Sequence, residues 1–264
     1  MPDRYKILRG EQWSSRLAAA LPPASTSLVS WMEQRSHLIK QDAYSRVGLL
    51  DLNGVGCFLK LYLSKSALQK MGFHLHIARG LRAFDAGCAL RGAGLWVPES
   101  RACLLVSEGV LLMTEALAGA VDLREVALAA PDDMAIVRYL ERAAEALANL
   151  HSKGFKHGDC KFSNLLMHRH RVFLVDLERA RKIGVNADSR RPWHRKQLAD
   201  IARFTADAER FGIGSDAFAV FLQRYSGVMG YEANLLSDAL RPHLEGIRRR
   251  HEQRYAGLQK SSLL

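Results

Sequence analysis

The 264-residue sequence lacks several features that would assign it to a well-known class of protein. No stretch reaches the roughly 18 consecutive apolar residues that a membrane-spanning helix requires. The N-terminal segment MPDRYKILRGEQW contains no apolar core of the kind found in a secretory signal peptide. We therefore expect the chain to stay in the cytoplasm.

Cysteine is scarce and carries no pattern. The four cysteines, Cys57, Cys88, Cys103 and Cys160, are widely separated, and no CxxC pair occurs. Disulfide frameworks and structural zinc sites depend on closely spaced cysteines. The sequence predicts neither, and reduced thiols are expected.

Acidic residues are fewer than basic ones, with 27 Asp and Glu against 38 Lys and Arg and a formal net charge of +11. Such an excess favours an anionic partner, and nucleic acid, an acidic lipid surface or a phosphorylated glycan would each satisfy it. The basic residues gather at residues 179–196 and 248–254. Because solvated charges commonly form such runs, they indicate the sign of the partner and not its identity.

The sequence does contain an ordered set of polar residues in its second half. HGD at residues 157–159 is followed by Asn164, and Asp176 comes directly after the apolar run at residues 172–175. A carboxylate that orients a hydroxyl, with an amide and a second carboxylate that hold a metal, is what phosphoryl transfer from a magnesium nucleotide requires. The spacing is similar to the protein-kinase catalytic loop H-R-D-x-x-x-x-N and the D-F-G motif, in modified form.

Each of these residues has a predicted role. Asp159 is the predicted base or hydroxyl-orienting group, and Lys161 would neutralise charge on the transferring phosphoryl group. Asn164 and Asp176 offer hard oxygen ligands that suit Mg²⁺. His157 is expected to support the backbone of the loop and not to carry a proton.

A predicted hairpin in the first half carries a lysine of interest. Strands at residues 46–52 and 55–62 flank Asn53-Gly54, and Asn-Gly supplies the positive φ angles of a two-residue turn. Lys60 lies within FLKLY in the second strand, where an ammonium is costly to bury unless it meets an anion. Kinases direct a strand lysine at the α- and β-phosphates. We favour that role over an edge-strand lysine that reaches into water.

Two further segments would complete a nucleotide site. Residues 40–46 would form the turn over the phosphates, but they contain no glycine. Phosphate contacts there would have to use backbone amides or the side chains of Ser45 and Arg46. The segment that contains Glu115 and Leu117 would hold the adenine edge through backbone groups.

The expected ion-pair partner of the strand lysine is missing. A helix is predicted for residues 66–93, where a kinase places the glutamate that pairs with this lysine. No glutamate occurs between Lys60 and Glu99, and Asp85 is the only acidic residue in that interval. Either Asp85 takes the role or the ion pair is absent.

The remaining pattern predicts more strands followed by helices. Strands are expected at residues 102–106 and 110–115, a strongly amphipathic helix at 134–152, and further helices that include residues 197–204, 218–225 and 235–247. We predict an α+β, protein-kinase-like two-lobe fold with a small antiparallel-sheet N-lobe and a mostly helical C-lobe. The predicted divisions are an N-terminal extension at residues 1–36, an N-lobe at 37–117 and a C-lobe with the catalytic loop at 118–264.

In combination, FLKLY around Lys60, Gly94-x-x-x-Pro98, HGDCKFSN and VDLERAR resemble the bacterial lipopolysaccharide core kinases, the Kdo/heptose kinase group, over roughly residues 37–210. The resemblance implies ATP-dependent, Mg²⁺-assisted phosphorylation of a heptose or Kdo hydroxyl in the inner core. It implies work at the cytoplasmic face of the inner membrane, with peripheral contact to that surface. It also implies that Asp159 is catalytic, that Lys60 binds ATP, and that Asn164 and Asp176 hold the metal.

Other functions share part of the pattern. An aminoglycoside-type phosphotransferase also uses HGD, but its cationic substrates would favour an acidic cleft. Lipopolysaccharide core and its membrane are anionic, and basic residues near such a surface contribute about 1 kcal/mol each. A non-catalytic scaffold with a kinase fold would not need the set of Lys60, Asp159, Asn164 and Asp176. The absence of an A-P-E segment argues against a protein kinase, and we expect an anionic glycan as partner and no nucleic acid.

Overall fold

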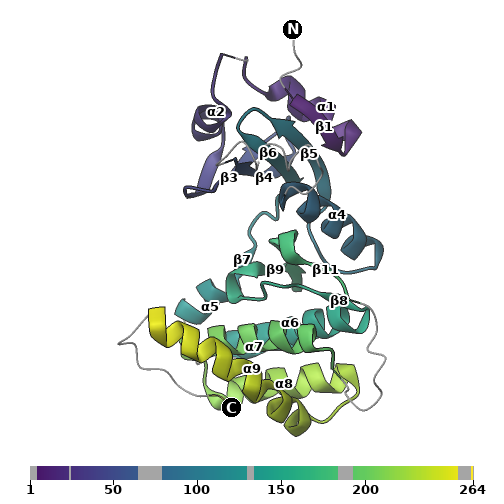
Figure 1. The fold of residues 1–264 in the computed structure, drawn as a ribbon, viewed down its shortest axis with the longest axis vertical. Helices are drawn as coiled ribbons and strands as arrows, with labels where there is room; N and C mark the ends of the chain where they lie inside the picture. Colours follow the sequence, from purple (N-terminus) through teal and green to yellow (C-terminus); the bar gives the residue numbers. More distant parts are fainter. Residues whose placement is uncertain are drawn as a thin grey trace. The chain divides into compact units, whose positions relative to one another are not determined.

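The computed structural model describes residues 5–23, 25–64, 79–129, 134–183 and 193–254, together with Leu263. The chain divides into two compact units, Met1–Gly92 with Val97–Ala118 and Ala93–Trp96 with Gly119–Leu264 (Figure 1). Among the described helices, none combines the length and the apolar character that a membrane crossing requires.

The first unit is built on a six-stranded antiparallel sheet with the strand order β1-β5-β6-β4-β3-β2 (Figure 1). The strands are β1 (Tyr5–Arg9), β2 (His37–Gln41), β3 (Ser45–Asp51), β4 (Gly56–Leu63), β5 (Ser100–Val106) and β6 (Gly109–Glu115). Asn53 and Gly54 turn the β3–β4 hairpin with φ angles of 56° and 80°. This confirms the two-residue turn that the Asn-Gly sequence predicts.

Helices cover both faces of this sheet. They are α1 (Glu11–Ala20) and α2 (Leu28–Arg35) on one face and α4 (Arg79–Gly92) on the other. Leu59 and Leu61 of β4 belong to the core under α1 and α2, whereas Tyr62 of β4 and Leu112 of β6 belong to the core under α4. A sheet buried on both faces needs apolar residues at successive positions, which explains the continuous apolar runs of β5 and β6.

Two stretches of this unit bear on the predicted divisions of the chain. Residues 65–78, where the predicted helix begins, lie outside the described residues, and α4 accounts for the rest of that helix. Residues 1–36 were expected to be an extension, and within them β1 pairs with β5 at one end of the sheet. The predicted boundaries at residues 36 and 117 stay a prediction.

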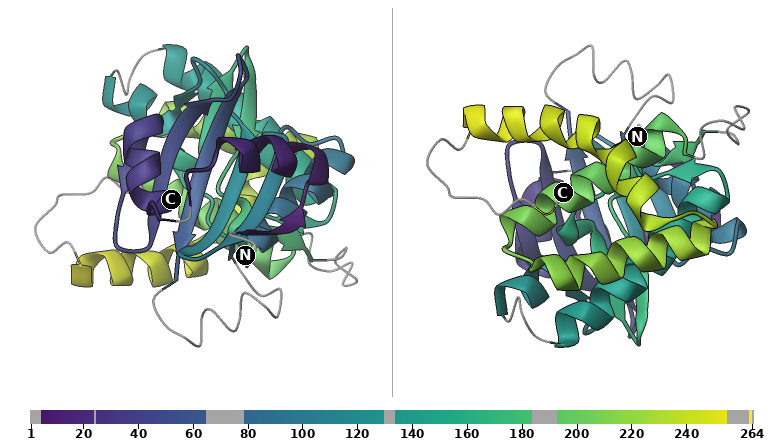
Figure 2. Two further views of the ribbon diagram at one scale, coloured as in Figure 1. Left: turned by 90° about the horizontal axis from the view of Figure 1, so that it is seen from above. Right: turned by 90° about the horizontal axis from the view of Figure 1, so that it is seen from below.

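The second unit is mostly helical. Its helices are α5 (Leu123–Ala129), α6 (Met134–Ser152), α7 (Arg195–Arg210), α8 (Ser215–Met229) and α9 (Ala233–Arg254). Helix α8 packs against α6, and α9 contacts both α7 and α8 (Figure 2). The predicted apolar stripe of α6 is completely buried at Ile136, Leu140, Ala143, Leu147 and Leu150, which confirms the helix at 134–152.

Two small sheets sit on these helices and carry the predicted catalytic segment. One has the order β10-β9-β7 and consists of β7 (Val121–Asp122), β9 (Leu165–His168) and β10 (Arg171–Leu174). The other pairs β8 (Phe155–Lys156) with β11 (Arg181–Lys182). Short 3-10 helices follow the catalytic loop (η1, Phe162–Asn164) and the strand β10 (η2, Leu177–Arg179). The polar residues of interest therefore lie on the short connections between these strands.

Candidate active site

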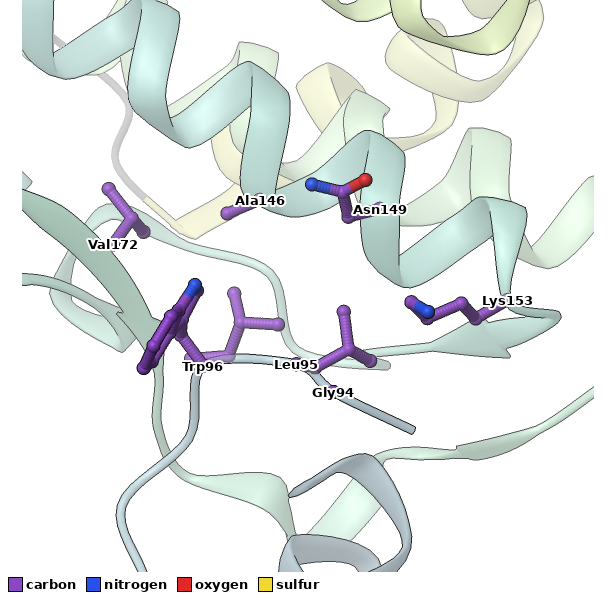
Figure 3. Close-up of a pocket in the computed structure, with 8 residues that line it drawn as sticks. Gly94, Leu95, Trp96, Ala146, Asn149, Lys153 and Val172 are labelled. Carbon is purple, nitrogen blue, oxygen red and sulfur yellow. The ribbon is translucent and has the colours of Figure 1, made fainter. Parts of the chain in front are cut away.

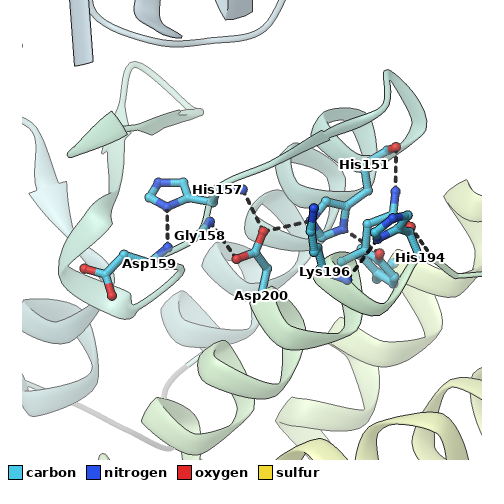
Figure 4. Close-up of polar contacts among 9 residues, drawn as sticks. His151, His157, Gly158, Asp159, His194, Lys196 and Asp200 are labelled. Atoms are coloured by element: carbon cyan, nitrogen blue, oxygen red, sulfur yellow. Dashed lines mark hydrogen bonds and ion pairs between the residues drawn. The ribbon is translucent and has the colours of Figure 1, made fainter. Parts of the chain in front are cut away.

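A buried carboxylate on α7 holds the first residues of the catalytic loop (Figure 4). Asp200 Oδ2 accepts a hydrogen bond from the His157 N–H at 2.6 Å, and Oδ1 accepts one from the Gly158 N–H at 2.8 Å. Behind it, His151 Nε2 lies 3.5 Å from Asp200 Oδ2, and His151 Nδ1 lies 2.7 Å from the Tyr225 hydroxyl. Burial alone would raise the pKa of Asp200, but the His151 contact, the nearby histidines and the Gly158 N–H bring that pKa below its ordinary value. Asp200 is therefore ionised and anchors the loop.

His157 connects the loop to the strand that precedes Asp176. Its Nδ1 accepts a hydrogen bond from the Asp159 N–H at 3.3 Å, which places the ring proton on Nε2, and Nε2–H donates to the Val175 carbonyl at 3.0 Å. Burial lowers the pKa of His157, against the opposing charges of Asp200, Asp159 and Asp176. The ring is thus neutral, and its contacts support the structural role expected for it.

Asp159 lies between two cations. Its Oδ1 is 2.7 Å from an Arg203 guanidinium nitrogen, and its Oδ2 is 3.3 Å from the Lys161 ammonium. The Asn164 amide nitrogen donates to the Asp159 carbonyl at 2.8 Å and lies 3.5 Å from Oδ2. The structure thus brings together Asp159, Lys161 and Asn164, and it adds Arg203 from α7.

Asn164 and Asp176 lie on neighbouring backbone segments. The Val175 N–H donates to the Asn164 carbonyl at 3.0 Å, and Asp176 adopts the left-handed region at φ 60° and ψ 54°, which is uncommon for a residue other than glycine. Within the described chain, both side-chain hydrogen bonds of Asn164 use its amide nitrogen, so Oδ1 is the atom left to bind a metal. An amide oxygen and a carboxylate fit Mg²⁺, which usually keeps waters and substrate phosphates as its other ligands. Among the described residues, no group of three His, Cys, Asp or Glu side chains is placed to bind a metal ion.

Gly158 occupies a position that only glycine can hold without strain. Its φ is +83°, and a Cβ there would lie 2.8 Å from the Arg179 carbonyl oxygen. We expect Gly158→Ala to lower the free energy of unfolding by about 2 kcal/mol or more, because a positive φ costs about 1–2 kcal/mol and the backbone clash adds to it. Gly212→Ala is the matched control, since Gly212 has φ +70° with open space around it. Urea denaturation measures the free energy of unfolding of both variants, and an equal loss in the two would contradict this account.

In the first unit, Lys60 lies on the sheet face covered by α4. It pairs across the sheet with Val47 and Leu112, and Leu112 belongs to the core under α4. Its ammonium lies 4.8 Å from the centre of the Tyr62 ring. The residue as a whole is half-buried.

The turn expected to cover phosphates is closed by its own carboxylate. Asp42 Oδ1 accepts hydrogen bonds from the Tyr44 N–H at 2.7 Å and the Ser45 N–H at 2.8 Å. The hydrogen bond from Lys40, followed by that from Tyr44, lowers the pKa of Asp42 to about 2. Two of the backbone amides that a phosphate could have used are therefore already engaged.

Ser45 and Arg46 point to opposite faces of the sheet. Ser45 pairs with Tyr62 and so shares the face of Lys60, whereas Arg46 pairs with Leu61 on the face of α1 and α2. There the Arg46 guanidinium donates to backbone carbonyls of the turn and lies 4.0 Å from Glu33. The structure does not bring Arg46 together with Lys60.

Asp85 also has another partner. Its Oδ1 lies 3.0 Å from the Arg9 guanidinium of β1. Both side chains are about half exposed, at 43% for Arg9 and 49% for Asp85. Contacts within the described residues therefore do not support Asp85 as the substitute for the missing helix glutamate.

The segment expected to bind adenine begins where β6 ends. The Glu115 N–H donates to the Glu99 carbonyl at 2.9 Å, and Glu115 Oε2 accepts a hydrogen bond from the Glu99 N–H at 3.2 Å. Within the part of the chain that is described, the backbone N–H and C=O of Leu117 make no hydrogen bond. The backbone of Leu117 is therefore open to the predicted contact with a purine edge, and that contact stays a prediction.

Three residues on α7 were not predicted. Asp200, Arg203 and Asp207 lie three and four positions apart, which places them on one face of the helix. Asp207 Oδ2 accepts a hydrogen bond from the Phe162 N–H at 2.9 Å, so all three contact the catalytic loop. The polar spacing within LADIARFTAD indicates that the three residues share a helix face, but an ordinary exposed polar face has the same pattern.

A hollow of about 160 Å³ lies elsewhere in the second unit, between residues 94–96, α6 and β10 (Figure 3). Trp96 lines this hollow, and two contacts hold it in place. The Leu174 N–H donates a hydrogen bond to the Trp96 carbonyl at 3.0 Å, and the Arg171 guanidinium lies 3.8 Å from the centre of the Trp96 ring. None of the predicted site residues lines this hollow. Within the Gly94-x-x-x-Pro98 segment, Trp96 therefore contacts β10.

Comparison with known proteins agrees with this geometry. The family described as "Lipopolysaccharide kinase (Kdo/WaaP) family" matches residues 31–225. Among solved structures, "WaaP in complex with acyl carrier protein" matches with a TM-score of 0.59 and 18% identity, over 95% of this chain and 99% of that chain. A search of curated proteins finds no match. The structural likeness confirms the predicted α+β, kinase-like fold class.

Proposed function

Because the chain belongs to the lipopolysaccharide kinase (Kdo/WaaP) family, we propose that it transfers the γ-phosphoryl group of ATP to a heptose or Kdo hydroxyl of the lipopolysaccharide inner core. Membership of the family confirms the resemblance seen in the sequence and makes the chain a phosphotransferase. The acceptor hydroxyl, the cofactors and the site of action belong to the proposal.

The contacts of Asp159 carry the proposal. Asn164 holds its backbone, His157 holds its N–H, and Asp200 holds the two residues before it. A carboxylate fixed in this way can accept a hydrogen bond from an acceptor hydroxyl and take its proton as the phosphoryl group is transferred. Lys161 adds positive charge beside the reacting oxygen atoms.

Other residues would bind the cofactors. Lys60 would contact the α- and β-phosphates of ATP, and the backbone of Leu117, next to Glu115, would contact the adenine edge. Asn164 Oδ1 and the Asp176 carboxylate would hold Mg²⁺. When bound, the magnesium nucleotide supplies the phosphoryl group and neutralises the charge that develops on it. Ser45 shares a sheet face with Lys60 and would add a contact, whereas Arg46 lies on the opposite face of the sheet.

We expect Lys60→Met to lower kcat/KM for ATP by about 10- to 100-fold. Hydrogen bonds to charged groups contribute about 1.5–3 kcal/mol, and methionine keeps the length of the side chain without its charge. Lys6→Met is the matched control, because Lys6 is an exposed lysine on β1 of the same sheet. Steady-state kinetics at varied ATP concentration measure both variants, and equal kcat/KM values for ATP would contradict the assignment of Lys60.

The activity itself is tested by incubating the purified chain with labelled ATP, Mg²⁺ and dephosphorylated core oligosaccharide, beside a panel of aminoglycosides. We expect label in the oligosaccharide. Label only in the aminoglycosides would overturn the proposal in favour of a small-molecule phosphotransferase. Binding of ATP without transfer to any acceptor would favour a scaffold.

The proposed acceptor also suggests where the protein works. A net charge of +11 suits an anionic glycan and an anionic membrane surface. We therefore propose peripheral contact with the cytoplasmic face of the inner membrane, and no role for nucleic acid.

A further inference from the structure

Four cations gather beside the catalytic loop. They are Lys156 on β8, Arg179 at the end of η2, Arg181 at the start of β11 and Lys196 in the first turn of α7. Several other basic residues of this unit pair with carboxylates, as Arg203 does with Asp159. Among the described residues, none of these four forms an ion pair. We refer to them as the cation cluster.

Two members of the cluster face each other across a strand pair. Lys156 and Arg181 are direct partners in the β8–β11 register, where Phe155 pairs with Lys182. Like charges opposite each other destabilise a strand pair. The cluster therefore adds a repulsive contact to one of the shortest sheets in the fold.

The cluster also packs directly on the catalytic loop. A Cβ placed on Gly158 would lie 3.0 Å from the Lys156 ammonium and 2.8 Å from the Arg179 Cβ. Burial lowers the pKa of Lys156, and the charges of Arg181, Lys196 and Arg179 lower it further, with Asp200 opposing them. The charges of the other three members thus act on Lys156, whose ammonium lies beside Gly158, the residue before Asp159.

The nearby carboxylate of Asp200 offsets this charge only in part, because the pKa of Lys156 stays lowered. Both oxygens of Asp200 accept backbone hydrogen bonds from the loop. The N-terminus of α7 is capped by His194, whose ring accepts the Lys196 N–H at 3.1 Å, and its first turn contains no acidic residue. Cations in the first turn of a helix are themselves unfavourable. An added anion would relieve each of these repulsions.

We propose that Lys156, Arg179, Arg181 and Lys196 form a subsite that binds a carboxylate or phosphate group of the acceptor glycan. The inference rests on the proposed function and adds the chemical class of the acceptor, a sugar that carries an anionic group near the hydroxyl to be phosphorylated. Guanidinium groups match the planar, two-oxygen geometry of carboxylate and phosphate, and the lysines add point charges. The subsite positions the acceptor, and Asp159 acts on its hydroxyl.

The test is a double variant, Lys156→Gln with Arg181→Gln, assayed with dephosphorylated core oligosaccharide. We expect its KM for the oligosaccharide to rise by about 100-fold, since each of the two lost charge-assisted contacts weakens binding about tenfold. The KM for ATP should change little. With the sugar-acid carboxylates of the acceptor reduced to alcohols, wild type and variant should have the same KM.

The matched control is Lys153→Gln with Arg169→Gln, which removes two exposed cations of the same unit that belong neither to the cation cluster nor to the catalytic loop. Equal KM values for the double variant and this control would overturn the subsite while leaving the proposed function intact. Circular dichroism of both variants checks that they are folded.

A second measurement does not depend on turnover. Titration of the wild-type chain with inorganic phosphate should give saturable NMR shifts at the backbone amides of Lys156 and Gly158, and the double variant should lose them. If wild type fails to phosphorylate the oligosaccharide, the proposed function falls and this titration still decides the subsite. Absence of the shifts in wild type would overturn the inference.

Discussion

Replacing Asp159 with asparagine should lower the rate of phosphoryl transfer by about 10³-fold. Positioned general bases contribute about 10²- to 10⁴-fold, and asparagine keeps the shape of the side chain while removing its ability to accept a proton. Binding of ATP should change little, because Lys60 and Leu117 are untouched. Single-turnover transfer from labelled ATP measures the first effect, and an ATP-binding titration measures the second.

The control for this variant is Asp238→Asn, which changes an exposed carboxylate on α9, 73% of whose surface is accessible. It should leave the rate unchanged. If the Asp159 variant kept more than about a tenth of the wild-type rate, the assignment of Asp159 as the base would fail. A loss of ATP binding in that variant would instead indicate that the carboxylate matters for the fold of the loop.

Replacing Asp200 with asparagine should lower the free energy of unfolding by about 3 kcal/mol and reduce phosphoryl transfer as well. An asparagine side chain has one acceptor oxygen, so its NH₂ group would face one of the two donor N–H groups of His157 and Gly158. Removing one partner of a buried charged contact typically costs about 3–5 kcal/mol. We expect a loss of about 3 kcal/mol because the asparagine amide keeps one of the two hydrogen bonds. Urea denaturation followed by circular dichroism measures the loss.

The effect of Asp200 should depend on pH. Because its pKa is lower in the folded chain than the ordinary value of 3.8, its contribution is present above that ordinary value and is lost as the pH falls through the lowered one. The stability gap between wild type and the Asp200 variant should therefore narrow below about pH 4. Asp238→Asn, an exposed change on α9, should show no such gap. A gap for Asp200 that stays constant with pH would contradict the anchoring role.

Sequence alone was sufficient where spacing is local. The spacing of Asp159, Asn164 and Asp176 in the sequence predicted that their side chains form a single site. In the structure Asn164 is hydrogen-bonded to Asp159, and its backbone pairs with the residue before Asp176. The apolar stripe of α6 and the Asn-Gly turn were likewise local patterns, and both were confirmed. Such patterns depend on the helical and strand periods, which a sequence displays directly.

The face on which a strand residue lies also follows from local pattern. Once Asn53-Gly54 is taken as a two-residue turn, the register makes Val47 the partner of Lys60. Arg46 must then lie on the opposite face, because side chains alternate along a strand. The expectation that Arg46 joins Lys60 at the phosphates conflicts with this alternation, and the turn alone is enough to separate the two side chains.

Contacts between distant segments could not be predicted. Asp200 accepts a hydrogen bond from a backbone N–H that lies 43 residues earlier in the sequence. Similarly, β1 pairs with β5 although most of the sequence of the first unit separates the two strands. A carboxylate on a helix gives no local sign that it accepts hydrogen bonds from a loop, because an exposed polar face has the same pattern. The contacts of α7 with the loop therefore required the structure.

The most direct test of the central claim is to identify the product. After reaction of wild-type chain with ATP, Mg²⁺ and dephosphorylated core oligosaccharide, phosphorus–proton correlation NMR should show a new phosphate ester on a ring carbon of a heptose or Kdo residue, and the Asp159→Asn variant should not form it. A phosphate ester that forms equally with the variant, or no sugar ester with wild type, would contradict the account.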